Sequence, residues 1–249
     1  MLDYVLMVVA GFAAGMLNAV AGGGTFVTFP ALVYLGVPVI SANATATLTA
    51  LPGYVSSAWA FRRDLRPEGS LGLRAIIAVA ALGAVVGAVL LLVTPSRVFS
   101  GVVPWLLLVA TLLFALGPRV LTLARARGMG MAGPLVAAAA IFAVSVYGGY
   151  FNGGLGIMLL ATFGLLGYVD LHGMNGLKNV LSAILSLISA ATFIAAGLIA
   201  WKPALIMAVA STAGGYIGAS QSRKIKRIGL LRGFVIAVGA VMTLLFFWK

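Results

Sequence analysis

The chain has 249 residues, of which 63% are hydrophobic and only 8% are charged. A soluble domain of this length carries roughly a quarter charged residues, so the composition excludes an ordinary soluble fold. The formal net charge of +12 does not indicate a nucleic-acid partner, because the basic residues lie in short connectors and leave no contiguous basic surface for a duplex. Zero cysteines exclude disulfides, iron–sulfur clusters and thiolate metal sites, and we expect neither a cofactor nor a metal ion.

Apolar runs recur along the whole chain, and most are long enough to cross a hydrocarbon core about 30 Å thick. The pattern predicts an all-α polytopic membrane protein. The predicted helical segments, in chain order, cover residues 3–21, 25–36, 42–61, 71–93, 98–117, 132–151, 155–168, 174–197, 202–219 and 229–248. Segments 25–36 and 155–168 are too short to cross a bilayer, so each is expected to form a broken, re-entrant hairpin with the segment before it.

A polar, glycine-rich break precedes each of these short segments. The first runs from Gly15 to Thr25 and contains Asn18 and three consecutive glycines. The second runs from Gly149 to Ile157 and contains an asparagine at the corresponding position, three residues after a glycine. Such a break in an apolar segment is costly unless it is buried or lines a cavity, so a matched pair indicates a binding site within the membrane.

The basic residues predict which face of the protein is cytoplasmic. Only Arg97, Lys202 and Lys249 lie on one predicted face. The opposite face carries Arg62, Arg63, Arg66, Arg74, Arg119, Arg125, Arg127, Lys178, Arg223, Lys224, Lys226, Arg227 and Arg232. The positive-inside rule makes this richer face cytoplasmic. We therefore expect a multi-pass protein of the cell inner membrane with its N- and C-termini both on the non-cytoplasmic side.

With this orientation the first hairpin begins outside and the second begins inside. Three full crossings are predicted to follow each hairpin. The chain is therefore predicted to contain two inverted-topology repeats, each a broken or re-entrant helical hairpin followed by three transmembrane helices. The repeats cover residues 1–117 and 132–249, and a cytoplasmic connector covers residues 118–131.

A small-residue motif also occurs once in each half. Gly83 and Gly87 in the first half correspond to Gly214 and Gly218 in the second. Glycines four residues apart let two helix backbones approach closely, either within one subunit or across a homodimer. We expect these glycines to serve packing rather than transport chemistry.

The two breaks have the composition of an anion site built from backbone. A helix that begins inside the membrane leaves its first N–H groups without intrahelical partners and carries a partial positive charge at that end. Glycines let an anion approach these groups, and asparagine and threonine side chains add hydrogen bonds. The alternative is that the asparagines only cap and the glycines only pack, but the duplication favours a site. The candidate residues are Asn18, Gly22, Gly23, Gly24, Thr25, Asn152, Gly153, Gly154 and Gly156.

A second polar cluster begins the long segment after each hairpin. Asn43 and Thr47 share one helix face in the first half, and Asn175 and Asn179 share the equivalent face in the second. Lys178, next to that face, has two interpretations. It either binds an anion, as intramembrane charges usually have a function, or extends to the cytoplasmic interface and only marks the topology.

The acidic residues favour an anionic ligand by their positions. All four, Asp3, Asp64, Glu68 and Asp170, lie at segment ends or in connectors. No carboxylate is therefore expected within the membrane to relay protons or hold a cation. An intramembrane enzyme is not expected, because one histidine, no cysteine and no buried acid pair leave acid–base and metal chemistry without their usual residues.

These motifs resemble the sulfite exporter TauE/SafE family over nearly the whole chain. In the first half the resemblance rests on Gly11-Phe12-Ala13-Ala14-Gly15, Asn18, Gly22-Gly23-Gly24, Phe29-Pro30-Ala31-Leu32 and Ala42-Asn43-Ala44-Thr45. In the second half it rests on Gly153-Gly154-Leu155-Gly156 and Asn175-Gly176-Leu177-Lys178-Asn179. The resemblance implies export, or sometimes uptake, of small sulfur-containing oxyanions such as sulfite and organosulfonates.

We therefore expect a secondary transporter, with export as the direction that the resemblance implies. The anion is expected to be held between the two hairpin helix starts and released by alternating access. The alternative is an anion channel that uses the same helix starts without alternation. The expected partners are a small anionic substrate of the sulfite or sulfonate class and the lipid bilayer.

Overall fold

The structure is a computed structural model that describes residues 1–20, 22–63, 65, 68–126, 132–221 and 228–248. In these residues the chain is helical and contains no strand, which confirms the predicted all-α class. The helices are α1 (Leu2–Val20), α2 (Thr25–Tyr34), α3 (Val39–Ala60), α4 (Leu73–Val93), α5 (Ser96–Ala126), α6 (Pro134–Tyr150), α7 (Leu155–Leu165), α8 (Leu171–Ala195), α9 (Trp201–Gln221) and α10 (Ile228–Phe247).

The predicted segments agree with these helices, with one clear difference. α5 continues as far as Ala126, through much of the predicted connector at 118–131, whose last five residues lie outside the described part. Several basic residues used for the predicted orientation also lie outside it, namely Arg66, Arg127, Arg223, Lys224, Lys226, Arg227 and Lys249.

The helix lengths match a multi-pass membrane protein. Among the described residues, four stretches are both long and apolar enough to cross a membrane: Leu2–Val20, Leu73–Val93, Ser96–Gly117 and His172–Ala195. α3 and α9 are of similar length, with 22 and 21 residues, and are more polar. α2 and α7 have 10 and 11 residues, and at 1.5 Å per residue neither spans a hydrocarbon core.

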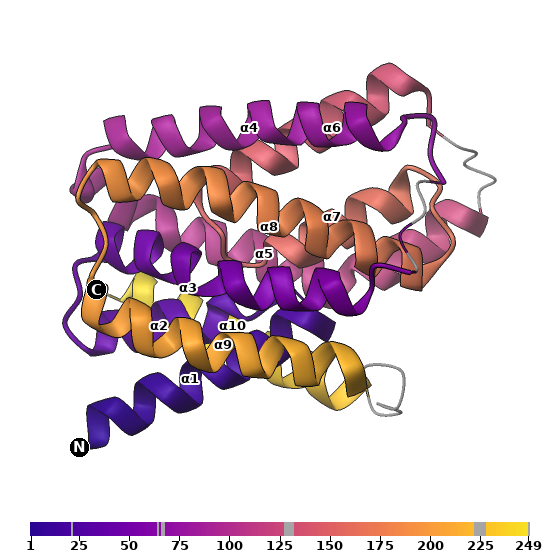
Figure 1. Ribbon diagram of the computed structural model, residues 1–249. Helices are drawn as coiled ribbons and strands as arrows, with labels where there is room; N and C mark the ends of the chain where they lie inside the picture. Colours follow the sequence, from indigo (N-terminus) through magenta and orange to yellow (C-terminus); the bar gives the residue numbers. More distant parts are fainter. Residues whose placement is uncertain (21, 64, 66–67, 127–131, 222–227, 249) are drawn as a thin grey trace.

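The long helices run roughly along one common direction (Figure 1). The N- and C-termini lie at one end of the bundle, and the end of α3 and the beginning of α4 lie at the other. The two termini therefore lie at the same end of the helix bundle. Which side of the membrane that end faces, and the inverted relation of the two halves, stay predictions.

The two halves interlock through their glycines. α1 packs on α9, where a Cβ added to Gly218 would lie 2.8 Å from the Met16 Cα atom. α6 packs on α4, where a Cβ added to Gly87 would lie 2.7 Å from the Tyr150 nitrogen. The first helix of each half therefore packs against a helix of the other half. The small-residue motifs serve packing within one chain, and they give no support to a homodimer.

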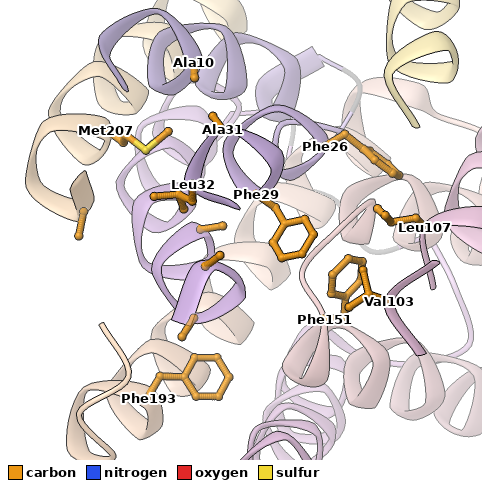
Figure 2. Close-up of a cluster of buried hydrophobic side chains, with 14 of the residues drawn as sticks. Ala10, Phe26, Phe29, Ala31, Leu32, Val103, Leu107, Phe151, Phe193 and Met207 are labelled. Carbon is orange, nitrogen blue, oxygen red and sulfur yellow. The ribbon is translucent and has the colours of Figure 1, made fainter. Parts of the chain in front are cut away.

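The short helices lie in an apolar core. Phe29 of α2 contacts Phe151, at the second break, edge to face with ring centroids 5.7 Å apart. Figure 2 shows these two rings beside Val103 and Leu107 of α5. All four side chains are buried. Because aromatic pairs of this kind add packing energy beyond the area they bury, the core holds both short helices in place.

Two loops fix the beginning of α8. The Glu68 carboxylate accepts hydrogen bonds from the Val169 and Asp170 nitrogens, at 2.8 and 3.1 Å. The Asp170 side chain in turn accepts from the His172 and Gly173 nitrogens and caps the helix. These contacts set the position of the helix that carries Asn175, Lys178 and Asn179.

Candidate functional site

The two breaks meet inside the protein, backbone against backbone. A Cβ added to Gly22 would lie 2.5 Å from the Gly156 Cα atom, and one added to Gly156 would lie 2.6 Å from the Gly22 Cα atom. Gly22 also has φ +80° and Gly154 has φ +75°, a backbone region that L side chains rarely adopt. The contact between the two backbones therefore requires glycine at positions 22 and 156.

The first break is tied to its own helix start. The Asn18 side-chain oxygen accepts a hydrogen bond from the Gly24 nitrogen at 2.7 Å, so it holds the chain just before α2. Asn18 is fully buried, and its side-chain nitrogen has no hydrogen-bond partner among the described residues. Thr25, the first residue of α2, is also buried, and its hydroxyl has no partner there either.

The second break is more open chemically. The Asn152 side-chain nitrogen donates to the Ser186 hydroxyl on α8 at 2.9 Å, and the Tyr147 hydroxyl donates to the Gly153 carbonyl at 2.6 Å. Within the described part of the chain, the backbone N–H groups of Gly153, Gly154 and Gly156 find no acceptor. The same holds for the Gly23 and Thr25 nitrogens of the first break, so both helix starts have amides without an acceptor among the described residues.

Tyr54 of α3 connects the two breaks, and sequence reasoning missed it. Its buried hydroxyl lies 3.2 Å from the Asn18 side-chain oxygen and 3.4 Å from that of Asn152. One hydroxyl proton serves only one of these acceptors at a time. Tyrosine in a membrane helix gives no distinctive sequence signal, since most such residues pack or lie at the interface.

Lys178 is fully buried, so its ammonium does not reach the surface of the protein in this structure. Its ammonium donates to the Asn18 and Ala19 carbonyls at 3.0 and 3.3 Å, and to the Asn175 side-chain oxygen at 3.1 Å. The two carbonyls belong to the last turn of α1, which carries a partial negative charge. Its partners here are neutral oxygens, so no carboxylate among the described residues compensates a charge on this buried amine.

The second polar cluster reaches the ends of the hairpin helices. The Asn43 side-chain nitrogen donates to the Tyr150 carbonyl, at the end of α6, at 3.0 Å. The start of α3 thus caps α6, just as the start of α8 caps α1. Thr47 donates to the Asn43 carbonyl of its own helix, so its hydroxyl is not directed at the breaks. Asn179 is fully buried, and neither end of its amide has a partner among the described residues.

Several of the predicted site residues therefore come together. Asn18, Gly22 and Gly24 of the first break lie with Asn152 and Gly156 of the second, next to Lys178. Gly23, Gly153 and Gly154 are buried in the same two breaks. Buried polar atoms rarely lack partners, so the unpaired groups of Asn18, Thr25 and Asn179 require an explanation.

A hollow of about 430 Å³ lies away from the break contact, between the ends of α3 and α9. It is lined by Trp59, Ala60, Phe61, Arg62, Arg63, Tyr216, Ala219 and Ser220. Phe61 and Ala219 also pack against Ala19, whose carbonyl oxygen binds Lys178. The end of α1 thus separates this basic hollow from the buried Lys178.

The two breaks themselves are in contact at Gly22 and Gly156 in this structure. An anion can therefore bind between them only if they move apart.

Comparison with known proteins identifies one family over nearly the whole chain. The family described as Sulfite exporter TauE/SafE matches residues 7–246. A probable membrane transporter protein of Haemophilus influenzae is 31% identical over 236 residues, which cover 94% of this chain and 90% of the relative. The probable membrane transporter protein YfcA of Escherichia coli K12 is 31% identical over 240 residues, covering 92% and 84%.

A third relative, the probable membrane transporter protein ORF9 of Sinorhizobium, is 27% identical over 245 residues, with 95% of this chain and 89% of the relative covered. These matches extend over almost the full length of each protein, and all three relatives are described as transporters. The chain belongs to the TauE/SafE sulfite exporter family of membrane transporters.

Proposed function

We propose that this protein is a secondary transporter that exports small sulfur-containing oxyanions, such as sulfite or organosulfonates, across the cell inner membrane. The anion is held between the two breaks, and alternating access releases it on the other side. The family name supports the substrate class, and the unpaired amides of the second break support an anion.

The observation that carries this proposal is the environment of Lys178. A buried charge is costly unless a partner compensates it, and the recorded partners of this ammonium are neutral oxygens. An oxyanion would supply the missing charge. It would also accept hydrogen bonds from the Asn18 side-chain nitrogen and from the amides of Gly153, Gly154 and Gly156.

The contact between Gly22 and Gly156 supports alternating access over an open pore. Two backbones in van der Waals contact leave no room for an ion, so this structure corresponds to a state closed at its centre. Opening requires the hairpin α1–α2 to separate from α6–α7. α1 of the first hairpin packs on α9, and α6 of the second hairpin packs on α4. This exchanged packing supports a duplicated structure whose two halves move relative to each other.

The test of substrate class is a binding screen on the purified protein. Sulfite, thiosulfate, sulfate, sulfoacetate and taurine are compared with chloride and acetate by thermal shift. We expect the sulfur oxyanions to raise the melting temperature and acetate and chloride to leave it unchanged. Taurine, which is zwitterionic at neutral pH, is expected to rank below sulfoacetate. Equal shifts for all anions would remove the substrate proposal.

The test of mechanism is counterflow in proteoliposomes. A transporter preloaded with unlabelled substrate accumulates labelled substrate transiently, and its initial rate saturates with concentration. We expect both properties. Flux that rises linearly without counterflow would identify an anion channel that uses the same site.

The proposed orientation places both termini outside the cytoplasm. Arg62, Arg63 and Arg74 lie at or beside the α3–α4 connection, at the end of the bundle opposite the termini, and the positive-inside rule makes that end cytoplasmic. A C-terminal fusion to alkaline phosphatase, which is active only outside the cytoplasm, is expected to be active. Activity of a C-terminal fluorescent protein that folds only in the cytoplasm would reverse this orientation.

A further inference from the structure

The polar residues of α8 between Asn175 and Ser189 share one helix face. At 100° per residue they fall within an arc of about 100°, and at 1.5 Å per residue they extend over about 21 Å, some two thirds of a hydrocarbon core. We call this set the α8 polar face. It consists of Asn175, Lys178, Asn179, Ser182, Ser186 and Ser189.

The rest of α8 is packed differently. Leu177, Leu181 and Leu185 are buried in an apolar cluster with residues of α4, α6 and α7. Lys178, Asn179 and the three serines are just as completely buried. The α8 polar face is therefore inside the protein and segregated from the apolar face, so exposure to water does not explain its polarity.

Hydrogen bonding within the helix does not explain the α8 polar face either. A serine or threonine in a helix can donate to the carbonyl four residues earlier, as Thr192 of the same helix does to Ile188 at 2.9 Å. Ser182 and Ser189 have no partner in the described part of the chain, and neither has the Asn179 amide. Serines that join helices would have partners on the neighbouring helix.

The α8 polar face connects the two breaks. Lys178 holds the end of α1 at the first break, and the Ser186 hydroxyl binds Asn152 at the second. Asn179 and Ser182 lie between these two contacts along the helix. Ser189 continues the same face by about one turn beyond the second break. α3 contacts α8 and carries Tyr54, whose hydroxyl is within reach of both breaks.

We propose that the α8 polar face is the path along which the anion crosses the protein. The hydroxyls of Ser182 and Ser189, on either side of Ser186 along the helix, donate hydrogen bonds to the anion's oxygens, and Lys178 supplies the charge at one end. This inference rests on the proposed function, because it takes a small oxyanion as the cargo. It adds residues that line the route rather than the central site.

The chain contains no cysteine, so single cysteines report access along this path directly. Ser182→Cys and Ser189→Cys are nearly isosteric changes. Ser145→Cys and Ser211→Cys are matched controls, because these serines are equally buried and also lack partners. The controls lie at helix-packing contacts instead, Ser145 against Gly83 and Ser211 against Gly53.

The probe is sulfonatoethyl methanethiosulfonate, a small thiol reagent that itself carries a sulfonate, and its cationic trimethylammonium analogue is the charge control. Both are applied to folded protein in proteoliposomes, with size-exclusion profiles to confirm folding. We expect the anionic reagent to modify Ser182→Cys and Ser189→Cys about tenfold faster than the two controls, since buried thiols are inert. We expect the cationic analogue to show no such difference.

Equal, slow modification of all four cysteines would overturn the path. Fast modification of the two path cysteines that millimolar methanesulfonate slows would support it with a sulfonate as cargo. Fast modification that methanesulfonate leaves unchanged, together with no thermal shift by any sulfur oxyanion, would support a polar path and contradict the proposed substrate. If sulfur oxyanions raise the melting temperature but the cysteines at positions 182 and 189 do not react, the proposal of a central site would stand and the proposal of a path would be overturned.

A second measurement does not depend on labelling. Ser182→Ala combined with Ser189→Ala is expected to lower the counterflow rate about tenfold with little change in the thermal shift at saturating anion, because lining residues affect passage more than central binding. Ser145→Ala combined with Ser211→Ala is expected to leave the rate unchanged. Equal rates for the two double variants would contradict the path.

Discussion

The two breaks look like copies in the sequence but differ in the structure. In the first, Asn18 holds the Gly24 nitrogen and Lys178 holds the carbonyls that precede it. In the second, Asn152 is turned toward Ser186, and the amides of Gly153, Gly154 and Gly156 have no acceptor among the described residues. The Gly23 and Thr25 nitrogens of the first break also lack an acceptor among the described residues. The difference is that a side chain holds one amide of the first break and, in the described part of the chain, none of the second.

This difference indicates a division of roles within one site. Among the described residues, a lysine meets the end of a hairpin helix at the first break, whereas Asn43 meets Tyr150 at the equivalent contact in the other half. In the proposed site the first break therefore brings the positive charge. The second break brings backbone donors. An anion between them would be bound by a charge on one side and by amides on the other, so the proposed site is asymmetric.

The contact that joins the breaks is expected to show the largest effect. Gly22→Ala places a side chain against the Gly156 backbone and requires φ +80°, so we expect a loss of about 3 kcal/mol in stability. Gly36→Ala is the matched control, because Gly36 has φ +81° and open space around it, and should lose only about 1 kcal/mol. Chemical denaturation in detergent measures both. Similar losses would show that the two breaks do not pack tightly.

Replacing Lys178 tests whether its charge at the first break contributes to anion binding. Lys178→Met is expected to weaken anion binding about a hundredfold, the order expected for losing a hydrogen-bonded charge. Lys202→Met removes the same formal charge at an exposed position beside Tyr4 and is expected to change binding little. Titration calorimetry with a sulfur oxyanion compares them. Equal affinities would remove Lys178 from the site.

The two asparagines sharpen the comparison between the breaks. Asn18→Ala is expected to cost about 1–2 kcal/mol of stability, because it leaves the Gly24 nitrogen uncapped. Asn152→Ala is expected to cost less stability and to weaken anion binding about tenfold, since it alters the more open side. Paired melting and binding curves for both variants check this. If Asn152→Ala instead lost more stability and Asn18→Ala weakened anion binding more, the roles assigned to the two breaks would be reversed.

The Tyr54 bridge is expected to show the smallest effect. Tyr54→Phe keeps the ring and removes a hydroxyl within reach of both asparagines. We expect a loss of about 1 kcal/mol, or about fivefold in binding, as for one neutral hydrogen bond. If the bridge connects the breaks, the double variant Tyr54→Phe with Asn152→Ala should lose less than the sum of the single variants. Additive losses would show independent roles.

The helices and the position of the breaks could be predicted because they depend on local patterns. Apolar runs and glycine clusters mark where helices begin and end, as at Thr25 and Leu155. The direction of a side chain depends instead on distant neighbours. The end of α1 determines where Lys178 points, and no pattern around residue 178 contains that information.

The residues that were missed illustrate two different limits. Tyr54 lies in α3, where Asn43 and Thr47 were predicted because they share one helix face. A single tyrosine forms no such spacing pattern, so the sequence did not single it out. The serines at 182, 186 and 189 do have a signal, because with Asn179 they repeat every three or four residues in an apolar helix. That spacing could have been found, although only the structure shows that the serines are buried and that two lack partners.

The most direct test of the central claim is to locate the anion. Selenite has the shape and charge of sulfite, and selenium gives an anomalous signal in crystals of the protein. We predict an anomalous peak between the two breaks, within hydrogen-bonding distance of the Lys178 ammonium and of the second-break amides. A peak confined to the basic hollow at Arg62 and Arg63, or none with selenite at concentrations that shift the melting temperature, would contradict the account.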